Sequence, residues 1–424
     1  MKPATAWIIG VGATRFQRWP QETHHALATS ALSEALEDAG LEDGHGIAAV
    51  WFGNCGMHHW GQANIRGQVA LDPLISDGLL PAGVPITNVE AGCATGSLAL
   101  HDAVAAVQSG RVTAALAIGV EKTFMPAHPE RMMALFDGAL DQLSPERWRT
   151  FYAEAAERHG LTYRPHPARI QLLDVCAMQA NWHMATYGTT SEQIAASAAK
   201  NHTHAQHNPR AQYQHPMTVA EVLADKAVVG PLTRSMCAPI SDGAAAAIVV
   251  NEAGLRQLSE RARRRAVPIL ACAQAGGTWD DLGTPTAARR AADAAYTQAQ
   301  IAPQQVDVVE LHDATSFAEV HLSEMLRLCP EGQGGVYVAS GEASLGGRRP
   351  ANLSGGLVSK GHPLGASGLA MIHELATQLR GEAGARQSEG CEIGLAENGG
   401  GLTGFDVASC AVTLLGRARG DRGQ

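Results

Sequence analysis

Cys93 is the residue of this sequence whose surroundings best suit a nucleophile. It lies in the stretch GCATG at 92–96, between a predicted strand at 86–89 and a predicted helix at 98–109. Small neighbours let a substrate approach the sulfur, and the N-terminus of a helix favours a thiolate. The alternative is a cysteine that is simply packed in the core, as free cysteines often are.

Three further residues could supply acid–base groups. His362 lies in the stretch KGHPLGASG, a loop bounded by Gly and Pro that leads into a helix, and His312 follows an apolar strand predicted at 306–311. The carboxyl edge of such a strand is where α/β proteins bind ligands. Glu397 begins the stretch ENGGG, which we expect to be a Gly-rich turn after a strand at 392–396. For both histidines the alternative is a purely structural role.

The elements that must position these groups occur twice. A strand, a tight turn, a helix and a strand run from 86 to 120, and a comparable helix and strand run from 365 to 397. The stretch GASGLA at 365–370 repeats the pattern of ATGSLA at 94–99. We therefore predict an α/β fold built from two diverged copies of one unit, with the best site between the copies.

Local signals predict further elements. An apolar strand begins at Trp7 and runs into a glycine turn at Gly10 and Gly12. A helix at 23–39 is closed by a glycine, the common end of a helix. An Arg-rich helix is expected at 255–265.

The composition changes between the two copies. From Phe124 to Arg234, Arg, His, Pro and Gln are frequent, with helical patterns at 147–159 and 175–187. We interpret this segment as an inserted lid. The predicted domains are an N-terminal half at 1–123 and 235–252, the lid at 124–234, a C-terminal half at 253–416 and a disordered tail at 417–424.

Composition excludes several classes of protein. The net charge of −9 and the lack of a long Lys/Arg run argue against nucleic acid or an anionic membrane as the main partner. No segment suits a signal peptide or a membrane span, so we expect a cytoplasmic protein. The eight cysteines contain no Cys-x-x-Cys pair, and the histidines at 202, 204, 207 and 215 lack acidic or cysteine partners at a familiar spacing. We expect neither a disulfide framework nor a metal.

In their order and spacing, the elements around Cys93, His312, His362 and Glu397 resemble the thiolase family, from the first strand to about Leu415. The motif GHPLGASG is highly specific. Two further parts of the chain look like the sterol-carrier-protein type. Its loop domain is matched by YGTTSEQ at 187–193, KNH at 200–202 and NP at 208–209, and its domain-end signature by LTRSMCAPISDGA at 232–244. The resemblance implies a thiolase fold, with two duplicated halves of the five-layer αβαβα type and an inserted lid.

The resemblance also implies roles for single residues. Cys93 would carry the acyl group, and His362 would activate it and donate to the enolate oxygen. His312 matches the position where most thiolases have an asparagine that holds a water in that oxyanion hole. The backbone N–H groups of Cys93 and Gly399 would form a second hole. Glu397 stands where most thiolases have a second cysteine, so it is either a carboxylate acid/base with a pKa raised by burial or a residue that only orients a neighbour.

The activity implied is that of an acyl-CoA C-acyltransferase, which cleaves a 3-oxoacyl-CoA with free coenzyme A or runs the reverse Claisen condensation. Coenzyme A would be a co-substrate and no cofactor would be bound permanently. Ser359, Arg348 and Arg349 are candidate contacts for coenzyme A. Relatives such as benzoylsuccinyl-CoA thiolase make a bulky or specialised acyl group plausible.

Alternatives within the same fold stay open. The departure at Glu397 is compatible with a retro-aldolase or a biosynthetic acyltransferase. A third alternative is a non-catalytic subunit that binds acyl-CoA or serves as a scaffold. The resemblance implies a homodimer, and several relatives associate with a small zinc-ribbon and OB-fold protein.

Overall fold

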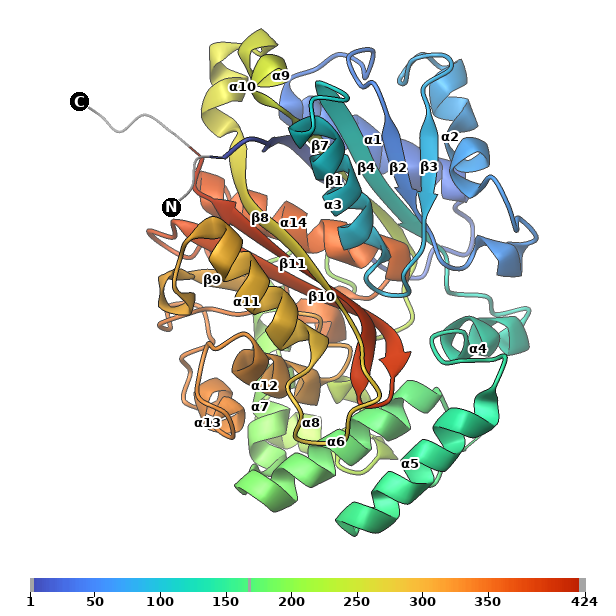
Figure 1. Ribbon diagram of the computed structural model, residues 1–424, viewed down its shortest axis with the longest axis vertical. Coiled ribbons are helices and arrows are strands. Elements are labelled where there is room, and N and C mark those ends of the chain that lie inside the picture. The colour runs from blue at the N-terminus through green and yellow to red at the C-terminus, as the bar shows by residue number, and fades with distance from the viewer. Residues whose placement is uncertain (1–3, 167–168, 419–424) are drawn as a thin grey trace.

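A single mixed sheet forms the centre of the computed structural model, which describes residues 4–166 and 169–418. Its nine strands lie in the order β3-β2-β4-β7-β1-β8-β11-β10-β9 (Figure 1). The first five in this order lie within residues 7–250 and form the N-terminal half of the fold, and the last four lie within residues 267–416 and form its C-terminal half. The strands are β1 (Trp7–Ala13), β2 (Val50–Gly53), β3 (Ile86–Val89), β4 (Ala114–Glu121), β7 (Gly243–Val250), β8 (Val267–Gly276), β9 (Val308–Glu310), β10 (Ile393–Thr403) and β11 (Asp406–Gly416).

The two halves of the sheet have the same topology. From the outer edge of the sheet inwards, the strands of the N-terminal half are β3, β2, β4, β7 and β1. In chain order these are the third, second, fourth, fifth and first strands of that half. The C-terminal half repeats this order, with an isolated parallel bridge between Val309 and Ala351 in the place of the third strand. The halves join where β1 runs antiparallel to β8. The predicted duplicated α/β fold is therefore confirmed.

Helices cover both faces of each half and form the layers. Helices α3 and α14 pack against each other between the two halves of the sheet, α1 packs on the far face of β1 and β7, and α11 packs on the far face of β8 and β11. The helices outside the insertion are α1 (His24–Ala39), α2 (Arg66–Ser76), α3 (Thr95–Gln108), α9 (Glu252–Gln257), α10 (Glu260–Arg265), α11 (Ala287–Ala299), α12 (Ser316–Met325), α13 (Gly334–Ala339) and α14 (Leu364–Arg380).

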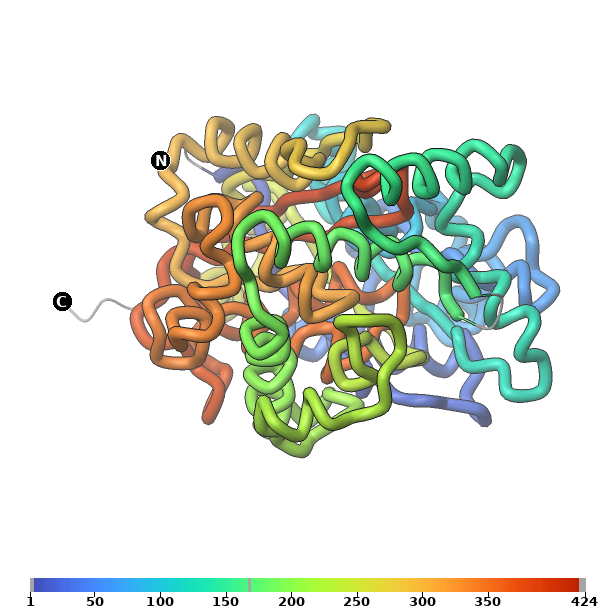
Figure 2. Tube along the Cα trace, turned by 90° about the horizontal axis from the view of Figure 1, so that it is seen from below, coloured from blue at the N-terminus to red at the C-terminus, as the bar shows by residue number. Residues whose placement is uncertain are grey.

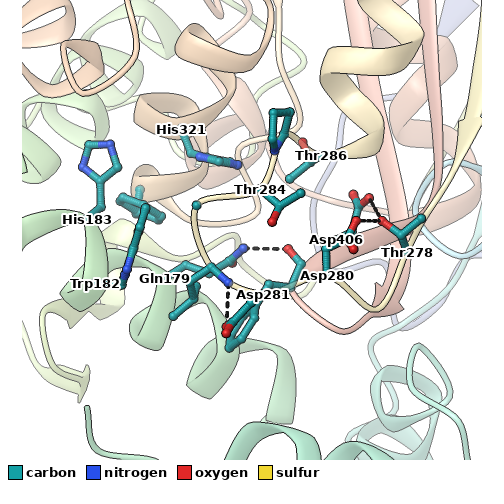
Figure 3. A pocket seen from close by; sticks show the side chains of 15 residues that line it. Gln179, Trp182, His183, Thr278, Asp280, Asp281, Thr284, Thr286, His321 and Asp406 are labelled. Carbon is teal, nitrogen blue, oxygen red and sulfur yellow. Dashed lines mark hydrogen bonds between the residues drawn. The ribbon is translucent and has the colours of Figure 1, made fainter. Parts of the chain in front are cut away.

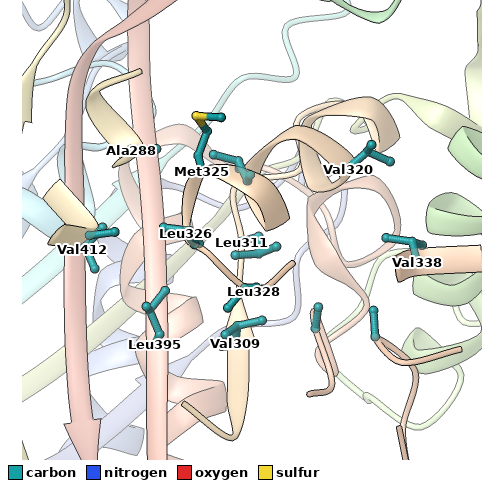
Figure 4. Packing of buried hydrophobic residues seen from close by; sticks show 14 of the residues in the cluster. Ala288, Val309, Leu311, Val320, Met325, Leu326, Leu328, Val338, Leu395 and Val412 are labelled. Atoms are coloured by element: carbon teal, nitrogen blue, oxygen red, sulfur yellow. The ribbon is translucent and has the colours of Figure 1, made fainter. Parts of the chain in front are cut away.

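Alternation along the strands divides the core between these layers. On β4, Leu116 and Ile118 face α1, whereas Ala115 and Ala117 face α3 and α14. The small residues on the inner face let the central helices lie close to the sheet. A third cluster joins the C-terminal strands to α11 and α12, and Figure 4 shows Leu395 on β10 among the side chains of this cluster.

Several elements agree with the local sequence signals, and two differ. Helix α1 begins after Thr23, whose Oγ1 accepts a hydrogen bond from the Ala26 N–H, and ends at Gly40 with a φ of 69°. Gly10 does not form a turn, because β1 continues through it. A Cβ at Gly10 would lie 2.2 Å from the Ala35 carbonyl oxygen, so this glycine lets α1 approach the strand. The expected Arg-rich helix is two short helices, α9 and α10, because Ser259 caps the second one.

The segment between β4 and β7 contributes no strand to the large sheet. It forms the helices and the small antiparallel pair that lie at one end of the molecule (Figures 1 and 2). Tyr152 anchors it, since its hydroxyl donates to the Gly404 carbonyl at the tip of the β10–β11 hairpin, at 2.6 Å. The elements are α4 (Pro129–Asp137), α5 (Pro145–His159), α6 (Gln171–Tyr187), α7 (Ser191–Ala205), α8 (Val219–Ala224), β5 (Ala227–Val229) and β6 (Leu232–Thr233).

The end of the chain is ordered further than expected. Arg417, predicted to begin a disordered tail, pairs with Glu392 at 2.9 Å, and Ala418 is buried. Residues 419–424 of the predicted tail lie outside the described residues. Within the described ranges, none of the helices has both the length and the apolar character needed to cross a membrane.

The contact between β4 and the N-terminus of α14 gives a test of this packing. A Cβ at Gly119 would lie 1.9 Å from the Gly365 carbonyl oxygen, so Gly119→Ala must push backbone against backbone. We expect a loss of about 1–3 kcal/mol in the free energy of unfolding, measured by urea denaturation. Gly46→Ala is the control, because a Cβ at Gly46 would have no other group within 4 Å. Equal unfolding midpoints for both variants would contradict the close approach.

Candidate active site

Four residues that are far apart in the sequence meet at one cavity. The Cys93 sulfur and one ring nitrogen each of His312 and His362 all lie within 4.8 Å of one another. Together with Glu397 they line a cavity of about 170 Å³. Cys93 comes from the turn between β3 and α3, His312 follows β9, His362 precedes α14 and Glu397 lies in β10. These are the residues expected to carry the chemistry, and the fold brings them together.

The Cys93 turn is tight and dry. Gly92 has a φ of +56°, which glycine adopts without strain, and α3 begins two residues after Cys93. Burial raises the pKa of the Cys93 thiol to about 12, and the nearby Glu121 and Glu90 carboxylates add to this shift. Burial therefore opposes the thiolate that we expect the helix terminus to favour, and that expectation stays a prediction. The thiol needs a base.

His362 is oriented to be that base. Ser367 Oγ donates to the Pro363 carbonyl at 2.9 Å, so it accepts from Nδ1–H of His362, at 2.7 Å. This assignment leaves the lone pair on Nε2 of His362. Burial, with smaller contributions from His312 and Lys360, lowers the pKa of His362 well below its usual value. The imidazole is therefore neutral and can take a proton.

His312 lies against His362. Their Nε2 atoms are 3.4 Å apart, and because Nε2 of His362 carries a lone pair, His312 is the donor of this weak hydrogen bond. Burial lowers the pKa of His312 to about 4, so it is a neutral donor. The two histidine loops are also tied together, because the Asp313 carboxylate accepts from the Leu357 N–H at 2.6 Å. Leu357 belongs to a π-helical turn at 356–360, a form frequent at functional sites.

Glu397 lies within a strand and not before a turn. Strand β10 continues to Thr403, so the expected Gly-rich turn is wrong. The carboxylate of Glu397 accepts from the His312 backbone N–H at 3.2 Å and from the Cys410 thiol at 3.2 Å. Burial raises its pKa to about 7, and the two hydrogen bonds hold the rise in check. A carboxyl group with this pKa can give and accept a proton near neutral pH.

The glycines after Glu397 serve close packing. A Cβ at Gly400 would lie 2.1 Å from the Ala91 carbonyl oxygen, so only glycine lets the Cys93 turn rest on β10. Gly400 and Gly401 line the cavity beside Cys93. Gly399, the expected oxyanion donor, is paired with Cys410 in the strand ladder, and its role as a donor stays a prediction.

Glu121 ties the loop after β2 to the start of α14, a role that the sequence patterns did not predict. Its carboxylate accepts from the backbone N–H groups of Gly365 at 3.1 Å, Cys55 at 2.9 Å and Gly56 at 2.9 Å. These bonds tie the end of β4 to the start of α14, just after His362. A carboxylate directly after an apolar strand was the available signal, because a buried acid needs such partners.

The rest of the cavity is mainly apolar and comes partly from the insertion. Helix α6 and the residues before it supply Ile170, Leu172 and Leu173, and α12 supplies Phe317. Leu402 and Phe405 close it from the hairpin. Such a wall excludes water and suits a hydrocarbon group attached to the sulfur.

The three candidate contacts for coenzyme A do not line this cavity. Ser359 is fully buried and its hydroxyl donates to the Tyr213 carbonyl at 3.1 Å. Arg349 is 5% exposed, and its guanidinium donates to the Val306 and Leu328 carbonyls at 2.9 Å. Arg348 pairs with Glu342. Arg349 and Ser359 therefore bind backbone carbonyl groups and are not free to bind a phosphate. The sequence could not show this, because it does not reveal that the two residues are buried.

The histidines of the insertion contact backbone groups. His204 accepts from the Leu345 N–H at 3.1 Å and lies 3.1 Å from the Asn352 carbonyl oxygen. His202 contacts the Ser359 hydroxyl at 3.1 Å. Among the described residues, the one group of His, Cys, Asp and Glu side chains close enough to hold a metal is Cys93, His312 and His362. Zinc accepts such a donor set, but it would occupy the sulfur that a nucleophile must keep free.

Comparison with known proteins agrees with the site. Residues 7–253 match the family described as "Thiolase, N-terminal domain", and 271–415 match "Thiolase C-terminal domain-like". The chain belongs to the thiolase family. An acetyl-CoA acetyltransferase of Methanothermobacter thermautotrophicus is 36% identical over 97% of this thiolase and 99% of its own length. Human sterol carrier protein 2 is 36% identical over 94% of this chain and 70% of its own.

Two further relatives extend the comparison. Benzoylsuccinyl-CoA thiolase subunit BbsB of Thauera aromatica is 29% identical over 90% of this chain and 91% of its own. The solved Ltp2-ChsH2(DUF35) aldolase has the same fold, with a TM-score of 0.75, 23% identity and 99% coverage of both chains. The resemblance to the sterol-carrier-protein branch is thus confirmed, and the family makes this thiolase an acyltransferase enzyme.

The raised pKa of Glu397 gives a test that does not depend on activity. Its pKa is about 7 in the folded protein and has a reference value of 4.5, so the folded state holds the proton more tightly. The stability that this proton provides is complete below about pH 4.5 and is lost as the pH rises through 7. The loss is about 3 kcal/mol. Measured by denaturant unfolding at pH 5 and pH 8, Glu397→Gln should lose less stability than the wild type.

The control for this comparison is Glu154→Gln, since Glu154 is exposed on α5. It should follow the wild type at both pH values. If Glu397→Gln also follows the wild type, the carboxyl group of Glu397 is not held protonated by burial.

Proposed function

We propose that this thiolase cleaves a 3-oxoacyl-CoA with free coenzyme A, or runs the reverse condensation, through an acyl group on Cys93. The observation that carries the proposal is the meeting of Cys93, His312, His362 and Glu397 at the end of an apolar cavity. The named relatives include an acetyl-CoA acetyltransferase, which supports coenzyme A as co-substrate.

In the first half-reaction, His362 Nε2 takes the proton of the Cys93 thiol and the sulfur attacks the 3-keto carbon. The N–H groups of Cys93 and Gly399 would stabilise the tetrahedral oxyanion. The bond between C2 and C3 then breaks, and the electron pair passes into a thioester enolate. His362, now protonated, and a water on His312 would donate to the enolate oxygen. Glu397 protonates C2, and C1 and C2 leave with the original coenzyme A as acetyl-CoA, while the shortened acyl group stays on Cys93.

In the second half-reaction, the Glu397 carboxylate takes the thiol proton of coenzyme A. The new thiolate attacks the carbonyl carbon of the acyl-cysteine, and the Cys93 sulfur leaves and regains its proton from His362. Both carboxyl states are accessible because burial raises the pKa of Glu397 to about 7. The neutral imidazoles fit the same scheme. His362 must be neutral to accept the Cys93 proton, and His312 acts as a neutral hydrogen-bond donor.

A retro-aldolase of the same fold is the main rival. The solved structure of the same fold that is named an aldolase supports this alternative. The placement of Cys93 beside a neutral His362 favours thiolysis, because the resemblance implies that such aldolases do not depend on a cysteine nucleophile. A non-catalytic scaffold subunit would bind acyl-CoA without becoming acylated.

We also infer a homodimer and an additional protein partner. Strand β3 is an edge of the sheet, its central residues Thr87 and Asn88 are exposed, and it leads directly into the Cys93 turn. An exposed edge favours pairing with a second chain. BbsB is named as a subunit and ChsH2 as a DUF35 protein, which supports a small zinc-ribbon and OB-fold partner. Light scattering of the purified chain tests the dimer, and a monomeric mass would contradict it.

The covalent intermediate is tested by intact mass. Mixed with a 3-oxoacyl-CoA, the protein should gain the mass of the acyl group and lose it when coenzyme A is added. Cys93→Ala should gain nothing, and its thiolysis rate should fall by on the order of a thousandfold or more, because the nucleophile is removed. Cys391→Ala is the control, since Cys391 is buried against the Gln378 carbonyl and lies outside the cavity. EDTA is present throughout to exclude zinc at the sulfur.

Glu397→Gln in the same assay tests the acid/base role. The thiolysis rate should fall by about 10²–10⁴-fold and the pH dependence near 7 should disappear, because the amide can neither give nor take the proton. Glu154→Gln again serves as the control. Full activity in Glu397→Gln would mean that Glu397 only orients His312 and Cys410.

A further inference from the structure

A second, smaller chamber opens beyond the apolar cavity. Its volume is about 30 Å³, enough for a single hydroxyl-sized group, since one water needs about 10–15 Å³. Figure 3 shows it between α6, α12 and the loop from Thr278 to Thr286. The two cavities share several wall residues, namely Gln179, Thr286, Phe317, His321, Phe405 and Asp406. A group that fills the first cavity from Cys93 therefore has its far end at the second.

His321 stands at the junction without a partner. Its Nε2 atom is buried and has no hydrogen-bond partner among the described residues. His24 Nε2 is likewise buried without a hydrogen-bond partner among the described residues, whereas His101 contacts the Thr413 hydroxyl at 2.8 Å and His183 contacts Glu324 at 3.1 Å. An unpaired buried polar atom destabilises a protein by about 1–3 kcal/mol, and a hydrogen-bonding group on a substrate that reached it would remove this cost. Burial lowers the pKa of His321 to about 4, so the ring is neutral and can donate or accept.

Carboxylates surround the rest of the chamber. Asp280 accepts from the Thr278 hydroxyl at 2.5 Å, and Asp406 accepts from the Ala287 N–H at 2.8 Å. Asp281 forms the third acidic wall. Two of the three have cationic partners, since Arg290 lies 2.7 Å from Asp406 and Arg158 lies 3.1 Å from Asp281. The carboxylate oxygens can accept hydrogen bonds from a neutral donor, and Asp280, the one of the three without a cationic partner among the described residues, repels an anion.

The apolar cavity limits the size of what lies between. An apolar cavity of about 150 Å³ holds a benzene molecule, and this cavity is about 170 Å³. Its walls of Ile170, Leu172, Leu402 and Phe405 offer hydrocarbon contacts only. A six-membered ring or a branched chain of similar volume therefore fits beside the acylated sulfur.

We propose that the acyl group transferred by this enzyme is a compact, ring-sized hydrocarbon that carries a hydroxyl group at the end remote from the thioester. The hydroxyl would donate its single proton to the acidic wall of the small chamber and accept a hydrogen bond from the Nε2–H group of His321. The inference rests on the proposed thiolysis, and it adds the class of substrate. It disfavours a remote carboxylate, because Asp280, which has no cationic partner among the described residues, would repel it.

The test uses matched thioesters. The panel is 3-cyclohexyl-3-oxopropanoyl-CoA and two derivatives that carry a hydroxyl or a carboxyl group at position 4 of the cyclohexyl ring. Each is made with no, one or two methylene groups between the ketone and the ring. At the best spacer length, kcat/KM for the hydroxylated member should exceed that of the unsubstituted member by about tenfold to a hundredfold. The carboxylated member should be the poorest of the three.

Variants of His321 locate the effect. In His321→Phe the ratio of kcat/KM between hydroxylated and unsubstituted substrates should fall to near unity, whereas His321→Gln, which keeps a hydrogen-bonding group, should retain most of it. His45→Phe, at an exposed position, should leave the ratio unchanged. If His321→Phe does not fold, His321→Leu takes its place in the comparison.

The outcomes separate the two proposals. Thiolysis of acetoacetyl-CoA or of the unsubstituted ring, with no preference above about threefold for any hydroxylated member, would overturn the substrate class and leave thiolysis standing. A preference that His321→Phe retains would overturn the role of the small chamber. No turnover and no Cys93 adduct with any thioester would overturn the proposed function itself.

Discussion

The chemistry of this enzyme depends on the burial of its reactive groups between two halves of one sheet. Removal from water raises the pKa values of the Cys93 thiol and the Glu397 carboxyl and lowers that of His362. The Cys93 thiol and the His362 imidazole are therefore neutral at rest, and the Glu397 carboxyl, with a pKa of about 7, reaches both protonation states near neutral pH. Each proton transfer then creates charge only when a substrate is present to share it, and the apolar wall keeps water from competing.

That burial requires the two halves to approach closely. Gly119 on β4 meets the Gly365 carbonyl at the start of α14, and Gly400 on β10 meets the Ala91 carbonyl before Cys93. Glu121 bridges the same gap through its hydrogen bond from the Gly365 N–H, and its bonds from the Cys55 and Gly56 N–H groups fix the carboxylate to the loop after β2. The glycines of the motifs around Cys93, His362 and Glu397 are thus explained by backbone contacts as much as by flexible loops.

Sequence patterns were sufficient for elements that signal their own ends. Helix α1 has its cap at Thr23 and its stop at Gly40, and the repeated GASGLA and ATGSLA stretches revealed the duplication. They failed where a residue's surroundings come from other parts of the chain. Arg349 reads as a surface arginine but binds buried carbonyls, and the ENGGG stretch reads as a turn but continues β10.

By itself, the sequence determined the α/β duplication, the thiolase family and the four residue types that meet at the cavity, because strand and helix periodicity and short motifs are local properties. Only the tertiary structure decided the protonation states of those residues, the tautomer of His362, the roles of Ser367, Glu121 and Cys410, and the polar chamber at His321. These depend on burial and on partners from distant segments, since desolvation and hydrogen bonding arise only when the chain has folded.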